Sequence, residues 1–486
     1  MKILMAASEM TPYIKTGGLG DVLGALPKTL AARGHKVAVC LPYYRSLTVP
    51  VADVRAFPED ISISVGDRTF SARVYEVRQR KNKVNVWLIR CDQLFGRDSL
   101  YVDPATGADY ADNDERFIFF SRAIFEAASQ AVFPPDILHV HDWQTALAPV
   151  YMKELHKSRL MYAETKSVLT IHNLAHQGTF PPDRYPLTGL DPDLLRPGEP
   201  FEFYGRVNFL KAGIVYADKI TTVSPRYARE ITTEPFGAGL HGVLRSRVDD
   251  LVGVLNGVDY TVWSPSRDRR IPYRYHINNL GGKRKTRVEL MNILGLPIRE
   301  GVPLIGVISR LAHQKGFDLI AAAAERMFEM DVQVVVLGVG EERYHRLFET
   351  LQQRYPDKLK CFFRLDEDLA HLIEAGADIF LMPSLFEPCG LNQIYSLKYG
   401  TVPLVHSVGG LADTIAPFNP ETGEGNGFAF DEPTPEALLE TLRQAVDIFS
   451  KKRIWTRLMK NGMQQDYSWA GVVGKYEELY RELLRS

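Results

Sequence analysis

Two positively charged loops that contain glycine are the segments of this sequence best suited to hold an anion. The first is Lys15-Thr16-Gly17-Gly18-Leu19-Gly20-Asp21, which follows a short apolar run at the N-terminus. Gly17 and Gly18 let backbone N–H groups approach a ligand, the following helix adds partial positive charge at its N-terminus, and Lys15 adds a full charge. A tight turn without a ligand is the alternative, and a lone glycine-rich loop does not decide between the two. The functional interpretation is a cradle for a diphosphate or a sugar.

The second loop carries two cations, in the run Ser309-Arg310-Leu311-Ala312-His313-Gln314-Lys315-Gly316. Surface exposure is the commonest fate of arginine and lysine. Here the loop follows an apolar run of strand length and precedes a helical pattern, and ligands of open parallel sheets bind beyond the carboxyl ends of the strands. We therefore expect Arg310 and Lys315 to face a ligand and to neutralise a departing diphosphate.

A third segment, Glu387-Pro388-Cys389-Gly390-Leu391, lies between an expected strand and an expected helix. Glu387 is placed to accept hydrogen bonds from sugar hydroxyls, while the backbone of Gly390 and Leu391 is placed to face a phosphate. The alternative is that Glu387 only complements the helix dipole.

Two other kinds of site are disfavoured. A dinucleotide-binding fingerprint needs G-x-G-x-x-G and an acidic residue after the second strand, and this chain has Gly17-Gly18-Leu19-Gly20 and Cys40-Leu41-Pro42 instead. His139 and His141 share one face of a strand, but no third ligand is placed beside them, so packing is preferred over a metal site. We expect no metal and no cofactor.

Seven ordered motifs together resemble those of the bacterial glycogen synthase and plant starch synthase family. They span nearly the whole chain: Lys15-Thr16-Gly17-Gly18-Leu19-Gly20-Asp21, His139-Val140-His141-Asp142-Trp143, Thr170-Ile171-His172-Asn173-Leu174-Ala175, Leu255-Asn256-Gly257-Val258-Asp259, Ser309-Arg310-Leu311, Gln314-Lys315-Gly316 and Glu387-Pro388-Cys389-Gly390-Leu391.

The resemblance implies an α/β protein of the GT-B fold, with two Rossmann-like domains facing each other across a deep cleft. It implies transfer of glucose from ADP-glucose to the non-reducing end of an α-1,4-glucan, such as glycogen or a maltooligosaccharide, with retention of the anomeric configuration. Two alternatives stay open, a transferase of the same fold that uses UDP-glucose and a glucan-binding relative without catalysis.

The resemblance also implies roles for individual residues. Lys15, Arg310 and Lys315 bind the donor phosphates, Glu387 contacts the donor glucose, and His172 and Asp142 line the reaction centre. The remaining implied contacts with ADP-glucose come from Gly17, Gly18, Asp21, Cys389, Gly390 and Leu391. For the glucan acceptor, stacking by Trp143 and a contact from Asn173 are expected, although a large aromatic beside a strand end is more often packed in a core.

Three positions depart from the family pattern. Asn392 and Val408 replace threonines that flank the expected phosphate site, so Val408 removes one hydroxyl donor. Leu365 stands where a tyrosine usually covers the adenine, which leaves the choice of nucleotide open. Tyr395 stands where other retaining transferases have a second glutamate, as in the synthase branch.

The elements that must position these loops are strands alternating with helices, which indicates parallel sheets covered on both faces. The expected strands are 3–7, 36–41, 137–141, 168–171 and 219–223 in the first half, and 304–309, 332–337, 360–365, 379–383 and 402–406 in the second. The expected helices are 22–32, 116–131, 317–330, 341–354 and 469–484.

This pattern appears twice, which predicts an N-terminal acceptor-side domain over 1–250 and a C-terminal nucleotide-sugar domain over 251–468. The crossover is expected in the segment 253–301, with a hinge near Gly257. Family resemblance implies that the C-terminal helix, about 469–486, packs back on the first domain.

The composition indicates which kinds of partner and which cellular compartment to expect. The 486 residues carry 58 Lys and Arg against 59 Asp and Glu, so no global field attracts nucleic acid or an anionic membrane. Cys40, Cys91, Cys361 and Cys389 show no metal or disulfide spacing. No apolar run is long enough for a signal peptide or a membrane span. These features favour a cytoplasmic protein without nucleic-acid or membrane partners.

Overall fold

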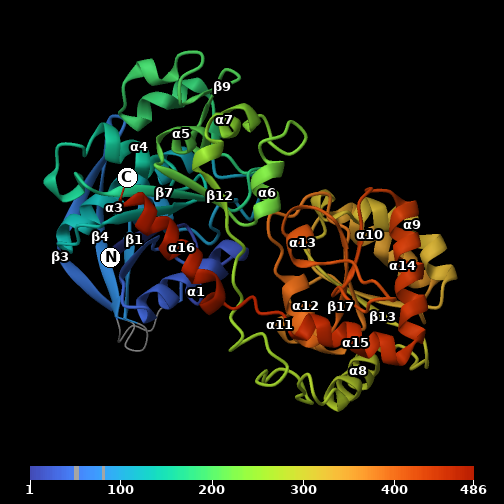
Figure 1. Cartoon of the computed structure of the whole chain (residues 1–486). Coiled ribbons are helices and arrows are strands. Elements are labelled where there is room, and N and C mark those ends of the chain that lie inside the picture. The colour runs from blue at the N-terminus through green and yellow to red at the C-terminus, as the bar shows by residue number, and fades with distance from the viewer. Residues whose placement is uncertain (49–53, 79–82, 486) are drawn as a thin grey trace. The chain divides into compact units, whose positions relative to one another are not determined.

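The computed structural model describes residues 1–48, 54–78 and 83–485, and the chain divides into two compact units (Figure 1). Unit 1 comprises Met1–Val223, Ala228–Gly257 and the C-terminal segment from Trp469, and unit 2 comprises Ser224–Tyr227 and Val258–Ser468. Unit 1 ends later than the predicted boundary at residue 250, because strand β12 (Leu251–Gly253) pairs in parallel with β11 (Lys219–Thr222) at the edge of the unit 1 sheet.

Unit 1 is built on a sheet with the strand order β12-β11-β7-β6-β1-β2-β5-β4-β3. The remaining strands are β7 (Lys166–Ile171), β6 (Ile137–His141), β1 (Lys2–Ala6), β2 (Lys36–Pro42), β5 (Val84–Arg90), β4 (Arg68–Arg78) and β3 (Val54–Val65). The central strands pair in parallel and are buried on both faces, which explains their almost continuous apolar sequences. All five predicted strands of this half are confirmed, with ends within two residues.

The strands β3, β4 and β5 extend this sheet beyond the predicted strands. β4 is antiparallel to both neighbours, so the edge of the sheet departs from the parallel pattern. Ile61, Ile63 and Val65 are buried and alternate with exposed residues, as expected for a strand with one covered face. A second, small sheet contains β8 (Thr179–Phe180), β10 (Arg206–Asn208) and β9 (Glu202–Phe203).

Helices cover both faces of the unit 1 sheet. The main ones are α1 (Gly18–Ala32), α3 (Asn113–Gln130), α4 (Leu147–Glu154), α5 (Phe209–Tyr216) and α16 (Trp469–Leu483), with shorter helices at α2 (Asp92–Phe95), α6 (Pro225–Glu230) and α7 (His241–Ser246). Helix α1 begins at Gly18, four residues before the predicted start, so the second glycine of the pair is already helical.

The C-terminal helix α16 packs against α1 within unit 1 (Figure 1). Arg33 and His35, just after α1, each place a nitrogen 2.9 Å from the carboxylate of Glu477 on α16. The hydrogen bond from Arg33, with a smaller one from His35, lowers the pKa of Glu477 to about 2. This charged contact ties the end of the chain to the first helix; Ser486, the last residue of the predicted segment, lies outside the described residues.

Unit 2 is built on a parallel sheet with the order β15-β14-β13-β16-β17-β18. Its strands are β15 (Leu359–Phe362), β14 (Gln333–Leu337), β13 (Leu304–Ile308), β16 (Ile379–Met382), β17 (Val402–His406) and β18 (Phe428–Phe430). The five predicted strands are confirmed, but β15 ends at Phe362, so Leu365 lies beyond the strand that was expected to contain it. β18 was not predicted.

The helices of unit 2 are α8 (Gly281–Leu294), α9 (Phe317–Glu329), α10 (Glu342–Arg354), α11 (Glu367–Gly376), α12 (Asn392–Tyr399), α13 (Gly409–Thr414), α14 (Pro435–Ser450) and α15 (Lys452–Met463). α9 and α10 confirm the predicted helices. α8 lies inside the segment expected to be an irregular crossover; it packs on α11 and buries Leu290, Met291 and Leu294.

Within the described residues, no helix combines the length and the apolar character that crossing a membrane requires.

Candidate active site

In unit 1, the predicted anion loop lies between β1 and α1 and is exposed. Lys15 Nζ lies 3.0 Å from Asp21 Oδ1, and their side chains are 53% and 32% exposed. A side chain at position 20 would collide with Lys15, so Gly20 allows the loop to fold back on the first turn of α1. The structure thus brings Lys15 and Asp21 together, with Gly17 and Gly18 exposed at the helix N-terminus between them.

Glu9, which was not predicted as a site residue, holds this loop in place by accepting hydrogen bonds from it. Its buried carboxylate accepts hydrogen bonds from Thr16 N at 2.5 Å, from Thr16 Oγ1 at 2.7 Å and from Gly17 N at 3.2 Å. Tyr101 OH donates to the same carboxylate at 2.7 Å. Glu9 therefore fixes the loop through its backbone, and its place three residues after β1 was the only sequence signal for it.

Asp142 and His172 meet at the carboxyl ends of β6 and β7. The backbone N–H of His172 donates to Asp142 Oδ1 at 2.7 Å. Asp142 has φ +57°, a conformation that a non-glycine residue seldom adopts and that concentrates at functional sites. Burial raises the pKa of Asp142 to about 7, against the opposing hydrogen bonds from the backbone of His172 and Asn173.

The ring of His172 is held by a second histidine. His141 Nδ1 lies 3.0 Å from His172 Nε2, and burial lowers the pKa of His172 to about 3. His139, beside His141 on β6, uses both ring nitrogens: Nδ1 lies 2.7 Å from Tyr480 OH and Nε2 lies 2.6 Å from Thr170 Oγ1. A neutral imidazole at His172 can orient a ligand but brings no charge. Both ring nitrogens of His139 have protein partners, which gives it the structural role expected from the sequence.

The two residues predicted to contact the acceptor, Trp143 and Asn173, differ in burial: Trp143 is buried and Asn173 is half-buried. The Trp143 side chain is 8% exposed and packs on Phe117, with ring centroids 4.9 Å apart, and against Gly178. This is the core packing that the sequence left open as the alternative to stacking on a sugar. Asn173 is half-buried beside Asp142, and its Oδ1 accepts from Ala175 N at 3.1 Å.

In unit 2, half-buried Lys315 and buried Glu387 form an ion pair. Lys315 Nζ lies 2.5 Å from Glu387 Oε2, with the side chains 19% and 8% exposed, and Ser384 Oγ donates to the same oxygen at 3.1 Å. Gly316, at φ +74°, lies against the carbonyl of Pro383, where any side chain would collide. This close approach holds the loop after β13 against the loop after β16.

Arg310 lies at the start of the same loop and is exposed. Among the residues that the structure describes, its guanidinium has no ion-pair or hydrogen-bond partner. Its charge is therefore available to a ligand, whereas that of Lys315 is balanced by Glu387.

Cys389, Gly390 and Leu391 lie between Glu387 and helix α12. Cys389 is buried, Gly390 has φ +67°, and Leu391 is the residue before the first turn of α12. Gly410 N donates to the carbonyl of Glu387 at 3.0 Å, so the start of α13 packs on this segment. The backbone here is fixed by neighbouring loops in advance of any ligand.

The three positions that depart from the family pattern differ in their contacts and exposure. Asn392 Nδ2 donates to the carbonyl of Ile308 at 2.8 Å, which ties α12 to the end of β13. Val408 is 5% exposed and packs in an apolar cluster with Leu397 and Leu411. Leu365 is 86% exposed on the loop between β15 and α11.

Family models match both parts of the chain. A starch synthase catalytic domain model matches residues 2–246, and a group 1 glycosyl transferase model matches residues 294–457. The glycogen synthase of Koribacter versatilis (strain Ellin345) is 45% identical over 99% of this chain and 98% of its own length. That of Anaeromyxobacter dehalogenans (strain 2CP-C) is also 45% identical, over 99% of this chain and all of its own length.

Among solved structures, the catalytic domain of starch synthase IV from Arabidopsis thaliana, bound to ADP and acarbose, is similar with a TM-score of 0.91 and 32% identity. The match covers 100% of this chain and 99% of that one. Two parallel-sheet units, each with a cationic loop after its central strand, together with this match define a retaining glycosyltransferase of the GT-B fold. The chain belongs to the bacterial glycogen synthase and plant starch synthase family.

Proposed function

We propose that this enzyme transfers glucose from ADP-glucose to the non-reducing end of an α-1,4-glucan and that it does so in the cytoplasm. The observation that carries the proposal is the ion pair of Lys315 with buried Glu387, together with the exposed Arg310, which has no ion-pair or hydrogen-bond partner among the described residues. The relatives named glycogen synthase and the starch synthase solved with ADP and acarbose support the choice of substrates.

The donor diphosphate binds to Arg310 and Lys315 in this proposal. A diphosphate carries more negative charge than one carboxylate, so it competes with Glu387 for Lys315. Glu387 then turns its carboxylate to the hydroxyls of the donor glucose, while the N–H groups of Gly390 and Leu391 face the phosphate. Cys389 stays a buried neighbour in this arrangement and is not a nucleophile.

Unit 1 supplies the acceptor side and one further cation. Lys15 exchanges Asp21 for the leaving diphosphate, with Gly17 and Gly18 beside it at the start of α1, and Asp21 stays close to the nucleotide sugar. His172 and Asp142 line the centre where the acceptor 4-hydroxyl attacks, and Asn173 contacts the acceptor. Preorganised donors of this kind stabilise the charge that develops as ADP leaves.

Donor choice is the part of the proposal that the chain itself leaves open. Leu365, at the position where a tyrosine covers the adenine in the family, presents an exposed aliphatic side chain. An aliphatic contact discriminates weakly between bases. UDP-glucose is therefore the second donor to test.

The experiment is transfer of labelled glucose from ADP-glucose and from UDP-glucose to glycogen by the purified full chain. The expected result is faster incorporation from ADP-glucose, with the label released as maltose by β-amylase, because that enzyme removes α-1,4-linked units from non-reducing ends. Faster transfer from UDP-glucose would replace the donor, and incorporation from neither would overturn the proposal. Lys315→Ala is the matched control for a contaminating activity.

A further inference from the structure

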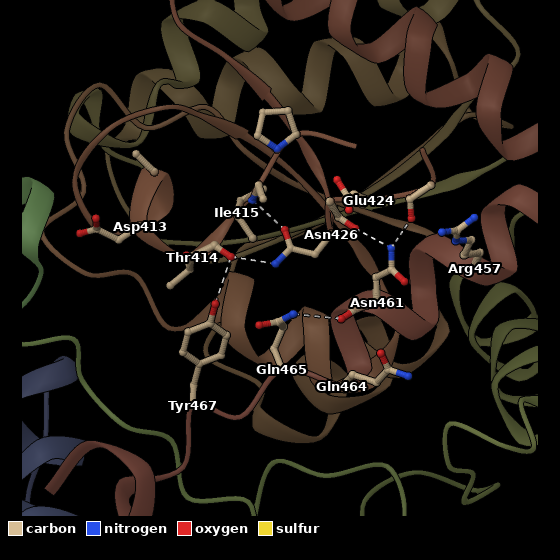
Figure 2. A pocket seen from close by; sticks show the side chains of 15 residues that line it. Asp413, Thr414, Ile415, Glu424, Asn426, Arg457, Asn461, Gln464, Gln465 and Tyr467 are labelled. Carbon is tan, nitrogen blue, oxygen red and sulfur yellow. Dashed lines mark hydrogen bonds between the residues drawn. The ribbon is translucent and has the colours of Figure 1, made fainter. Parts of the chain in front are cut away.

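Unit 2 contains a second hollow of about 660 Å³, apart from the site described above. It lies between the segment that follows α13, the turn around Gly423–Gly425, and helix α15 with the residues after it (Figure 2). None of the residues predicted for catalysis or for ADP-glucose lines it. The volume is within the range of roughly 300–1,000 Å³ that is usual for small-molecule sites.

The walls of this hollow are fixed by hydrogen bonds within the protein. Buried Asn426 accepts from Ala416 N at 2.8 Å and donates to Thr414 O at 2.9 Å. Asn461 donates to the carbonyls of Gly423 at 2.9 Å and Gly425 at 2.8 Å. Figure 2 shows these bonds as dashed lines around Asn426 and Asn461. The hollow therefore keeps its shape without a ligand, which reduces the cost of binding one.

Several carboxamide atoms that line the hollow, among them those of exposed Gln464 and Gln465, have no hydrogen-bond partner within the described part of the chain. Across residues 1–48, 54–78 and 83–485, the Oδ1 atom of Asn461, the Oε1 atom of Gln465 and the whole side-chain amide of Gln464 form no hydrogen bond with the protein. A carboxamide offers both donors and acceptors. Such groups match the hydroxyls of a sugar, each of which also donates and accepts.

The charges around the hollow argue against an anionic ligand. Arg457 is the cation in the lining, its guanidinium lies against Gly423, and it donates to Thr422 O at 2.8 Å. Asp413 and Glu424 place two carboxylates in the same lining. A nucleotide or a phosphate would meet net negative charge here, whereas a neutral ligand would not.

We propose that this hollow binds a neutral oligosaccharide, a stretch of the α-glucan acceptor distant from the end that reacts. The inference rests on the proposed function, because the glucan is the polyhydroxylated partner of this enzyme. A second attachment raises the effective concentration of chain ends at the reaction centre without any new contact there. The hollow thus favours long or branched acceptors over short ones.

The test uses two variants that spare the catalytic loops. Ala416→Trp fills the hollow from an exposed position and keeps the backbone bonds of residue 416, and the double variant Gln464→Ala/Gln465→Ala removes the free amides. Ala322→Trp, at an exposed position on α9 of the same unit, is the matched control. Glycogen affinity is measured by retardation of the full-length protein in native gels that contain glycogen, without any donor.

Both variants are expected to raise the apparent Kd for glycogen by about tenfold or more, the scale of losing one of two linked attachments. Their turnover with ADP-glucose and maltotriose, which is too short to reach two sites, should stay within about twofold of the parent, and Ala322→Trp should behave as the parent in both assays. Unchanged glycogen affinity in the double variant would overturn the inference, as would an equal loss with maltotriose and glycogen. Failure of the proposed function is a separate result, because it would appear as no glucose transfer by the parent protein.

Discussion

Each unit holds a lysine in the loop that follows the central strand of its sheet and pairs it with a carboxylate, but the two pairs lie in different surroundings. The pair of Lys15 and Asp21 is largely exposed, whereas Lys315 is half-buried and Glu387 is buried, with Ser384 as an additional donor. An exposed ion pair contributes about 0–1 kcal/mol to stability. Removing one partner of a pair whose carboxylate is buried costs more, because the remaining charge is buried and unpaired. The charge of Lys315 is thus held in place within unit 2, whereas that of Lys15 in unit 1 is freer to change partner.

The largest expected effect is that of Lys315→Ala. Turnover should fall by about 10²- to 10³-fold, because a preorganised donor to the leaving group is removed. The midpoint of thermal unfolding should also fall, since Glu387 remains buried without its partner. Initial rates at saturating donor and thermal unfolding measure the two effects. Normal turnover would remove Lys315 from the phosphate site.

Arg310→Ala separates the ligand role from the structural role in unit 2. Turnover should fall by about 10²-fold, because a donor to the leaving group is lost. The unfolding free energy should change by less than about 0.5 kcal/mol, because Arg310 is exposed. Arg453→Ala, at an exposed position on α15, is the control and should change neither quantity. A stability loss as large as that of Lys315→Ala would contradict the distinction between the two cations.

Lys15→Ala tests the exposed side of the comparison. We expect a smaller effect, about a tenfold loss in kcat/KM for the donor, because screening weakens exposed charges. The same loss should shrink as salt is raised, and stability should change by less than about 0.5 kcal/mol. The measurement is kcat/KM for the donor in the parent and the variant at a series of salt concentrations. A salt-independent loss as large as that of Lys315→Ala would mean that the two loops act alike.

The last prediction concerns the pH dependence of stability in unit 1. An aspartate in an unfolded chain has a pKa of about 3.9, and burial raises that of Asp142 to about 7, so the folded protein binds the extra proton between these values. Asp142 therefore costs stability that grows from pH 4 to pH 7. Asp142→Asn should unfold at a higher temperature than the parent at pH 8, with a smaller difference at pH 5. An equal difference in unfolding temperature at pH 5 and pH 8 would show that the pKa of Asp142 is not raised.

The strand and helix pattern was sufficient to predict most of the fold. Parallel sheets place their loops at one edge, so the sequence alone located the Lys15 and Lys315 loops correctly relative to β1 and β13. The antiparallel strands β3 and β4 were missed because their half-exposed pattern differs from the buried runs of the central strands. Helix α8 was missed because polar residues dominate its sequence.

The details of the site required three-dimensional contacts. Lys315 and Glu387 are far apart in the sequence, and spacing does not tell which carboxylate a lysine meets. Glu9 was overlooked because its role is to hold backbone N–H groups, which leaves no motif. Val408 was expected to cost a phosphate contact, yet its side chain packs in an apolar cluster, so the structure gives the valine a packing role.

The proposed function assigns Lys15 and Lys315 to the same donor diphosphate, and a double-mutant cycle tests this assignment most directly. The cycle compares kcat/KM for ADP-glucose in the parent, Lys15→Ala, Lys315→Ala and the double variant. If Lys15 and Lys315 contact one leaving group, the two losses should depart from additivity by about 0.5–3 kcal/mol. Strict additivity would contradict the claim, because it would mean that the two lysines act at independent places.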